Sequence, residues 1–247
     1  MDRTVVILDW DDTLCPSSWL DQHELVPRIH ADQLDASLPL PLMNELYKVS
    51  CKVNELLMKA TSYGPVFIVT AAERGWVEMS SELFLPDVAR ALQHDDVHII
   101  SARTWYETHY GLYGTAQDWK NEVVSIIAAE CFTNGAASRM NPIDGQFHLI
   151  SIGDSMVERD ACHAAADNTP FTLAKTLKFI AKPTVDELVQ QVEVALNAFD
   201  HLCNADSTLD VQLSRLHLDK STVPPTTTNI VNGSSTQSAP YVETRAV

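Results

Sequence analysis

Three aspartates stand within four positions near the start of the sequence, directly after an apolar run. The run is Val5–Leu8, and the acids are Asp9, Asp11 and Asp12. Such a run predicts a buried strand, and acids at the carboxyl end of a strand in an open α/β sheet lie in the crevice where ligands bind. Two carboxylates about 4 Å apart repel by roughly 4 kcal/mol at an effective dielectric of 20. The cluster is therefore expected to need a cation, and oxygen ligands favour magnesium.

Further polar side chains follow apolar segments along the chain. Thr70 ends the run that begins at Val66, and Asp154 follows the run that begins at Phe147, with Gly153 between them. Lys120 opens a segment with helical periodicity. Carboxyl ends of parallel strands meet at one edge of a sheet, so we expect Thr70 and Asp154 to lie near the first acids.

Apolar runs alternate with amphipathic segments throughout the first 203 residues. The runs predict strands at residues 5–8, 66–70, 97–100 and 147–152, with a weaker candidate at 171–173. Apolar residues three and four apart predict helices at residues 42–60, 73–84, 86–93, 118–131 and 183–203. Asp118 is expected to cap its helix, and Thr184 with Glu187 forms a predicted capping box. The alternation predicts an α/β fold with a Rossmann-like, doubly wound parallel sheet.

The 247 residues divide into a folded part and a polar tail. Residues 1–203 are predicted to form one domain, and residues 204–247 a largely disordered tail. From residue 221 onward the tail is rich in Ser, Thr and Pro and has little to bury. The apolar residues between Leu209 and Leu218 fit a strand or a helix equally well.

Composition limits the partners and the compartment. The net charge of −16 disfavours binding to nucleic acid. The five cysteines are widely spaced and contain no C-x-x-C pair, which argues against a disulfide framework and a zinc site. No apolar run approaches the roughly 20 residues of a membrane span, and no signal peptide precedes the first strand. We therefore expect a cytoplasmic protein, with the nucleus as the alternative, and no membrane partner.

Four motifs, taken in order, resemble those of the haloacid dehalogenase-like (HAD) superfamily. They are Asp9-Trp10-Asp11-Asp12-Thr13, then Thr70, then Lys120, then Gly153-Asp154-Ser155 with Glu158. The resemblance covers roughly residues 4–182. The sequence segments around Thr70, Arg103 and Asp154 resemble those of a protist-rich group of eukaryotic members. This resemblance indicates no particular substrate.

The resemblance implies a magnesium-dependent phosphatase that works through an aspartyl phosphate. In this reading Asp9 is the nucleophile, and Asp11 is first the general acid and then the general base. Thr70 and Lys120 bind the phosphoryl group, and Lys120 offsets its developing charge. Arg103 is the competing cation, which could instead bind the substrate.

The resemblance also implies the metal ligands. Asp9, the backbone carbonyl of Asp11 and Asp154 would hold Mg²⁺. Glu158 lies one turn after Asp154 on the same face and would ligate through water. The superfamily more often has Asp at the position of Glu158. Asp12 is expected to be a solvated or capping side chain.

The intervals between the motifs leave no room for the full cap domain that many HAD-like members insert. Only about 25 irregular residues follow Cys15 before the first long helix, and two short helices with a strand fill the next interval. An open cleft admits a bulky phosphate ester such as a phosphoprotein, although a small molecule also fits. Large aromatic residues that are candidates for its rim are Trp19, Trp76, Trp105 and Tyr106.

Three other functions are compatible with parts of this pattern. A phospho-receiver domain needs its acceptor aspartate after the third strand, where this chain has Ser101-Ala102-Arg103. A phosphotransferase normally needs a cap to keep water out. A catalytically silent binding or regulatory module on the same fold stays as the main alternative, because the fold alone does not exclude it. The oligomeric state does not follow from the sequence.

Overall fold

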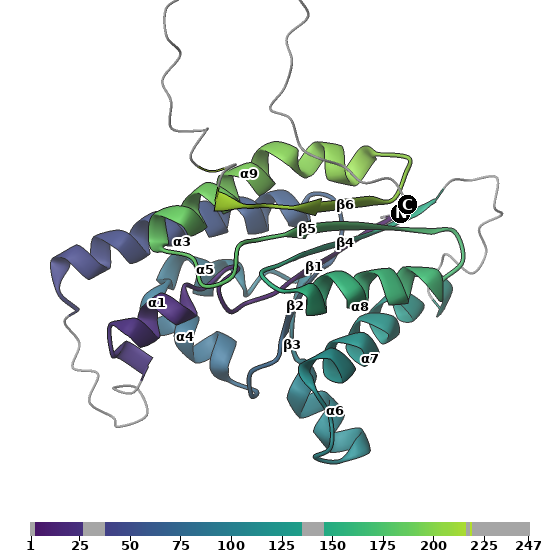
Figure 1. Cartoon of the computed structure of the whole chain (residues 1–247), viewed down its shortest axis with the longest axis horizontal. Coiled ribbons are helices and arrows are strands. Elements are labelled where there is room, and N and C mark those ends of the chain that lie inside the picture. The colour runs from purple at the N-terminus through teal and green to yellow at the C-terminus, as the bar shows by residue number, and fades with distance from the viewer. Residues whose placement is uncertain (1–2, 27–37, 135–145, 216–217, 219–247) are drawn as a thin grey trace, which may run out of the picture.

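The structure is a computed structural model that describes residues 3–26, 38–134, 146–215 and 218. Its strands form one six-stranded parallel sheet in the order β3-β2-β1-β4-β5-β6 (Figure 1). The strands are β1 (Thr4–Leu8), β2 (Val66–Thr70), β3 (Val97–Ser101), β4 (Phe147–Gly153), β5 (Thr172–Lys178) and β6 (Leu209–Gln212). The predicted α/β class and parallel sheet are confirmed.

Helices cover both faces of the sheet (Figure 1). On one face the core contains residues of α3, α4, α5 and α9, together with Val6 and Leu8 of β1. On the other face α7 and α8 pack with Val5 and Ile7 of the same strand. Alternate residues of β1 thus enter opposite cores, which explains its unbroken apolar run. The helices are α1 (Ser17–Gln22), α3 (Leu40–Thr61), α4 (Trp76–Phe84), α5 (Pro86–Ala91), α6 (Ala102–Tyr110), α7 (Ala116–Ala129), α8 (Met156–Asp167) and α9 (Val185–Asn204).

Capping boxes fix where three of these helices, α7, α8 and α9, begin. The predicted box of Thr184 and Glu187 at the start of α9 is confirmed. At α7 the expectation that Asp118 is the cap is wrong, because Thr115 is the cap and Asp118 is the third helical residue that bonds back to it. The helix therefore begins two residues before Asp118, which places Lys120 in its second turn.

The sheet extends beyond residue 203, where the sequence had placed the end of the domain. Residues Leu209–Gln212 form β6 and pair with β5. Arg159 of α8 makes an ion pair with Asp210 at 2.5 Å and so fixes β6 to the body of the domain. Four residues are too few for periodicity to separate strand from helix, which is why this strand was ambiguous. The predicted disorder of residues 219–247 lies outside the described residues.

No additional folded unit appears between the strands in the described part of the chain. The interval from β2 to β3 contains α4 and α5, and the interval from β3 to β4 contains α6 and α7. These helices pack on the sheet or on one another, in agreement with the absence of a full cap. None of the described helices has the length and apolarity needed to cross a bilayer.

A buried lysine ties the end of α9 to the sheet. The Lys175 side chain lies inside the protein, and its Nζ donates to the backbone oxygens of Ala205 at 2.6 Å and Cys203 at 3.3 Å. Nζ also lies 2.5 Å from Nδ1 of His148. Burial lowers the pKa of Lys175 to about 8. Carbonyls that α9 leaves without intrahelical partners are thereby satisfied.

Replacing Lys175 by Met should alter how stability depends on pH. Between about pH 8 and pH 10.4 the unfolded chain holds the Lys175 proton more tightly than the folded protein, so the wild type gains stability as pH rises through this window. Relative to Lys175→Met, its free energy of unfolding should increase by on the order of 3 kcal/mol at most. Urea denaturation across this range measures the difference.

The matched control for this experiment is Lys52→Met. Lys52 lies at the surface, and hydrogen bonds to Glu55 and Glu193 raise its pKa. Its difference from the wild type should therefore stay flat over the same pH range. A flat difference for Lys175→Met as well would contradict the prediction.

Candidate active site

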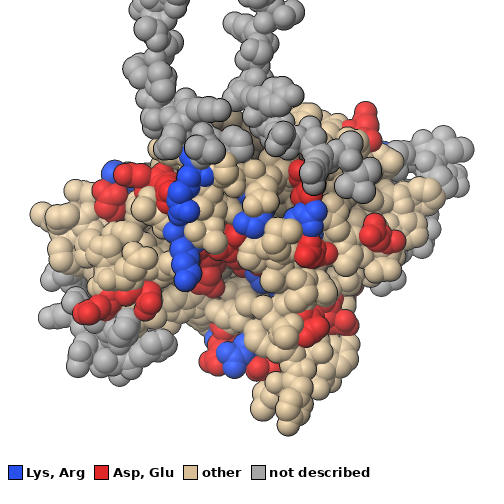
Figure 2. Space-filling view, in the orientation of Figure 1, with Lys and Arg blue, Asp and Glu red and all other residues tan. Residues whose placement is uncertain are grey.

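The acid-bearing loop continues the central strand β1 at its carboxyl end. The backbone N–H of Asp9 donates to the carbonyl of Ile152 at 2.9 Å, so β1 stays in register with β4 up to the aspartate itself. The Asp9 side chain is buried, with 4% of its surface exposed. On the face shown in Figure 2, Asp and Glu side chains line a hollow near the middle, and Lys and Arg side chains lie to its left and above it. Asp9 therefore lies buried at the carboxyl end of a central strand, as the sequence predicted.

Lys120 lies between two carboxylates. Its Nζ is 2.5 Å from Oδ1 of Asp9 and 2.5 Å from Oε1 of Glu158. The lysine side chain is only 4% exposed, so water contributes little to its solvation. Although burial alone would lower it, the two carboxylates hold the pKa of Lys120 above its usual value. The lysine is therefore a fixed positive charge beside Asp9.

Glu158 positions this lysine and also caps a helix. Its Oε2 accepts from the backbone N–H of Ser155 at 3.0 Å and from the Ser155 hydroxyl at 2.6 Å, which completes the capping box of α8. A Cβ atom on Gly153 would lie 2.4 Å from Cγ of Glu158. Glycine is therefore required at residue 153 for Glu158 to approach the end of β4.

Three carboxylates converge in the crevice. Ligand oxygens of Asp9, Asp154 and Glu158 all lie within 4.8 Å of one another. Burial, with Glu158 and Asp12 nearby, raises the pKa of Asp154 to about 7. Burial, with Glu158 and Asp11, also raises the pKa of Asp9, even though Lys120 opposes the shift.

The charges in this cluster do not balance. In the ionised cluster Lys120 supplies one positive charge against the three carboxylates of Asp9, Asp154 and Glu158. Burial tends to raise the pKa of Glu158, but Lys120 and Ser155 hold it low. The excess negative charge therefore falls on Asp9 and Asp154. A divalent cation with oxygen ligands fits both the donor set and the missing charge.

Asp11 belongs to a second, neighbouring group. Its Oδ2 accepts from the Thr70 hydroxyl at 3.1 Å, and its Oδ1 accepts from Nε1 of Trp76 at 2.8 Å and from the Ser17 hydroxyl at 2.5 Å. These bonds turn the carboxylate toward β2 and α4, outside the three-carboxylate cluster. Asp11 and Thr70 meet as predicted.

The partners of Asp11 were only partly visible in the sequence. Trp76 was a rim candidate, and the structure places its indole N–H on the acid. Ser17 was missed, because a serine in an irregular segment carries no distinctive signal.

Asp12 has a structural role. Its backbone has a φ of 56°, in the left-handed region. Its carboxylate accepts from the backbone N–H of Ser18 at 2.8 Å and from the Ser18 hydroxyl at 2.5 Å, at the first turn of α1. The side chain is buried, so it is a capping residue and is not solvated.

Arg103 is paired away from the acids. It makes ion pairs with Glu107 at 2.9 Å and with Glu73 at 3.4 Å, and its guanidinium lies 5.6 Å from the ring centre of Trp119. Of the two cations that the sequence offered, Lys120 is the one that contacts Asp9. A substrate contact for Arg103 stays a prediction.

Comparison with known proteins adds no relative. No protein-family model, curated protein or solved structure matches the chain. Fold and site together define the class, which is an α/β protein of Rossmann-like topology. A buried acidic crevice lies at the carboxyl ends of β1 and β4. The chemistry of the crevice is therefore inferred from its own residues.

Magnesium should stabilise the folded protein through this cluster. At 10 mM Mg²⁺ and a dissociation constant of about 1 mM, the melting temperature should rise by roughly 3 to 6 °C. Asp154→Asn should abolish this shift, because it removes one negative ligand. Differential scanning calorimetry with Mg²⁺ and with EDTA measures both.

Asp160→Asn is the control for the magnesium effect. Asp160 is on the same helix as Glu158, and its exposed carboxylate pairs with Arg159. This variant should keep the full shift in melting temperature. An equal loss in both variants, or no shift in the wild type, would contradict a cation site at Asp154.

Proposed function

We propose that this protein is a magnesium-dependent phosphatase that hydrolyses a phosphate monoester through an aspartyl-phosphate intermediate, as a HAD-like enzyme without a full cap. The observation that carries the proposal is the contact between buried Lys120 and Asp9, with Asp154 in the same cluster and the Asp11–Thr70 pair beside it. These are the groups that a covalent phosphoryl transfer needs at one strand end.

Asp9 is the nucleophile in the first step. Lys120 holds Oδ1, which leaves Oδ2 to attack phosphorus. The bond between phosphorus and the ester oxygen breaks, and Asp11 in its acid form gives its proton to the departing oxygen. The products are an alcohol and a phosphoryl group bonded to Asp9.

Asp11 acts as a general base in the second step. As a carboxylate it takes a proton from water while the water oxygen attacks phosphorus. The bond to Asp9 breaks, inorganic phosphate leaves, and Asp11 is again protonated. Hydrogen bonds from Trp76, Ser17 and Thr70 hold Asp11 in one orientation between the two steps.

Lys120 and Thr70 bind the transferring group. Lys120 stabilises the charge that develops on the phosphoryl oxygens, and its burial strengthens that interaction. Thr70 ends β2, and its hydroxyl accepts from the backbone N–H of Ala72 at 3.0 Å, which orients its own proton toward Asp11. The hydroxyl can turn that proton to a phosphoryl oxygen when substrate arrives.

Asp9 and Asp154 are the residues that would hold Mg²⁺, with the backbone carbonyl of Asp11. Glu158 uses both oxygens on Lys120 and Ser155, so we assign it a contact through water at most. When bound, Mg²⁺ supplies Lewis-acid charge for the phosphoryl oxygens and neutralises the carboxylates.

The proposed substrate is a phosphorylated small molecule or phosphoprotein. No full cap is present in the described ranges, which supports access for a bulky ester. The net charge of −16 supports neither nucleic acid nor an anionic surface as a partner. All five cysteines are free thiols, which supports a reducing compartment, the cytoplasm or the nucleus.

Asp9→Asn should abolish hydrolysis of 4-nitrophenyl phosphate in the presence of Mg²⁺. An amide is not a nucleophile, so we expect a loss of roughly a thousandfold or more in kcat. EDTA should have a comparable effect on the wild type, and Asp21→Asn, at an exposed position of α1, should not. Equal residual hydrolysis in all four samples would instead favour a catalytically silent binding module.

Asp11→Asn should slow turnover and trap the intermediate. Without a general base, release of phosphate should slow by roughly a hundredfold or more. Because 4-nitrophenol needs little help to leave, the phosphoenzyme should accumulate, and rapid quenching with ³²P-labelled substrate detects it. Wild-type turnover in this variant would remove Asp11 from its role.

A further inference from the structure

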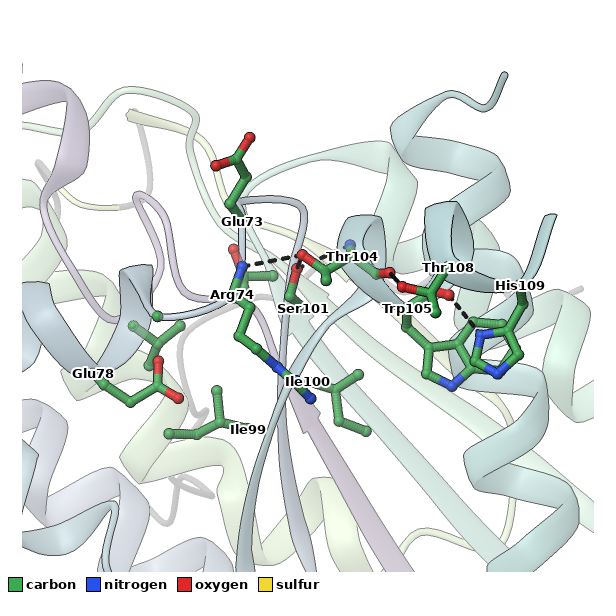
Figure 3. Close-up of a pocket in the computed structure, with 13 residues that line it drawn as sticks. Glu73, Arg74, Glu78, Ile99, Ile100, Ser101, Thr104, Trp105, Thr108 and His109 are labelled. Carbon is green, nitrogen blue, oxygen red and sulfur yellow. Dashed lines mark hydrogen bonds between the residues drawn. The ribbon is translucent and has the colours of Figure 1, made fainter. Parts of the chain in front are cut away.

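A groove of about 290 Å³ lies at the open edge of the sheet (Figure 3). Its lining residues include Thr70, which bonds to Asp11 in the candidate active site. Its walls come from α4, from strand β3 and from α6, and its floor includes Ile99 and Ile100. Strand β3 pairs only with β2 in the described part of the chain, so its other side is an edge.

The groove encloses this edge from both faces of the sheet. Ile99 and Ile100 are consecutive residues of one strand, and their side chains therefore point to opposite faces. Ile99 packs with the core under α4, and Ile100 packs with the opposite core beside Trp105 of α6. One groove can touch both isoleucines only by passing around the backbone between them.

The backbone in this groove has its hydrogen-bonding groups directed outward. The N–H of Val66 in β2 donates to the carbonyl of Asp96 at 2.8 Å. Peptide groups alternate along a strand, so Asp96, His98 and Ile100 face β2. The N–H and C=O of Ile99 consequently face the open edge. An open strand edge that lies in a groove is the geometry that binds an extended peptide as an added strand.

We propose that the segment of a phosphoprotein substrate next to its phosphorylated residue binds along β3 as an added strand. This inference rests on the proposed phosphatase function and deepens it. A strand added outside β3 lies three strand spacings from β1, roughly 14 Å, which an extended chain crosses in about four residues. The phosphorylated side chain then reaches Asp9 past Thr70.

The Arg74 side chain lies over the open edge of β3 in the free protein. Its exposed side chain extends along the groove beside Ile99 and Ile100 (Figure 3). It forms no ion pair with a residue in the described ranges, so the arriving peptide can displace it without breaking one. A charged side chain over an open edge also hinders pairing with a second copy of the chain.

Synthetic phosphopeptides test the added strand. Three alanines link a phosphoserine to a valine-threonine-valine-threonine segment, on the N-terminal side in one peptide and on the C-terminal side in another. The reference peptide has the phosphoserine and the alanines only. One of the two flanked peptides should have a kcat/KM at least tenfold above the reference, and equal values for all three would overturn the proposal in favour of a small leaving group.

N-methylation of that peptide separates backbone pairing from side-chain contact. Methylation of both valine nitrogens or of both threonine nitrogens should remove the gain, and methylation of the other pair should keep it, because alternate N–H groups face opposite edges. Equal effects of the two patterns would overturn the proposal.

A matched pair of variants tests the same bond from the side of the protein. Ile99→Pro deletes an N–H that faces outward, a change that an edge strand tolerates, whereas Ile99→Ala shortens the side chain and keeps the N–H. The ratio of kcat/KM for flanked and reference peptides should fall to about one in Ile99→Pro and stay severalfold above one in Ile99→Ala.

Hydrogen exchange gives a readout that does not depend on catalysis. A phosphonate analogue of the flanked peptide should slow exchange of the Ile99 amide at least tenfold in the wild type. Slowed exchange without hydrolysis of any ester would refute the phosphatase and retain the peptide site. Unchanged exchange of the Ile99 amide would refute the peptide site. Protection that appears without the analogue when the protein concentration is raised would indicate dimerisation through β3 and would also refute the peptide site.

Discussion

The buried positive charge of Lys120 determines how the helices α7 and α8 and the strand β1 meet. Lys120 is buried between Asp9 and Glu158, and an ammonium group in such a place is stable only while carboxylates contact it closely. The contacts hold α7 and α8 against the end of β1. Lys120 and the more distant Lys178 offset the charge of the neighbouring Asp154 only in part, because burial and Glu158 still raise the pKa of Asp154 to about 7.

Local structure supports that interaction from two sides. Thr115 starts α7 early enough to bring Lys120 to the strand ends, and Ser155 starts α8 with a capping box whose acid is Glu158 itself. Gly153 allows Glu158 to approach the backbone closely. The fixed lysine and the helix cap therefore depend on one carboxylate, so helix initiation and site electrostatics are coupled.

The candidate site and the groove at the sheet edge share one residue, Thr70. Thr70 bonds to Asp11 on one side and lines the groove on the other. Because no full cap covers the strand ends in the described residues, the groove along β3 is open to a long ligand. An exposed edge is normally a liability for aggregation, and here Arg74 lies over it.

The sequence by itself determined the sheet and the strand ends. Buried parallel strands are continuous apolar runs, so β1, β2, β3 and β4 could be predicted, and with them the places of Asp9, Thr70 and Asp154. Periodicity also predicted the helix that carries Lys120. Strand β6 was ambiguous because four residues carry too little periodic signal.

Only the tertiary structure decided which side chains meet. Asp11 accepts a hydrogen bond from Trp76, which is 65 positions further along the chain. Arg103 pairs with Glu73 and Glu107 and not with the aspartates of the site. Such contacts depend on side-chain direction and on packing between distant segments, which local spacing does not encode. The open edge at Ile99 likewise exists only because β3 is the last strand of the folded sheet.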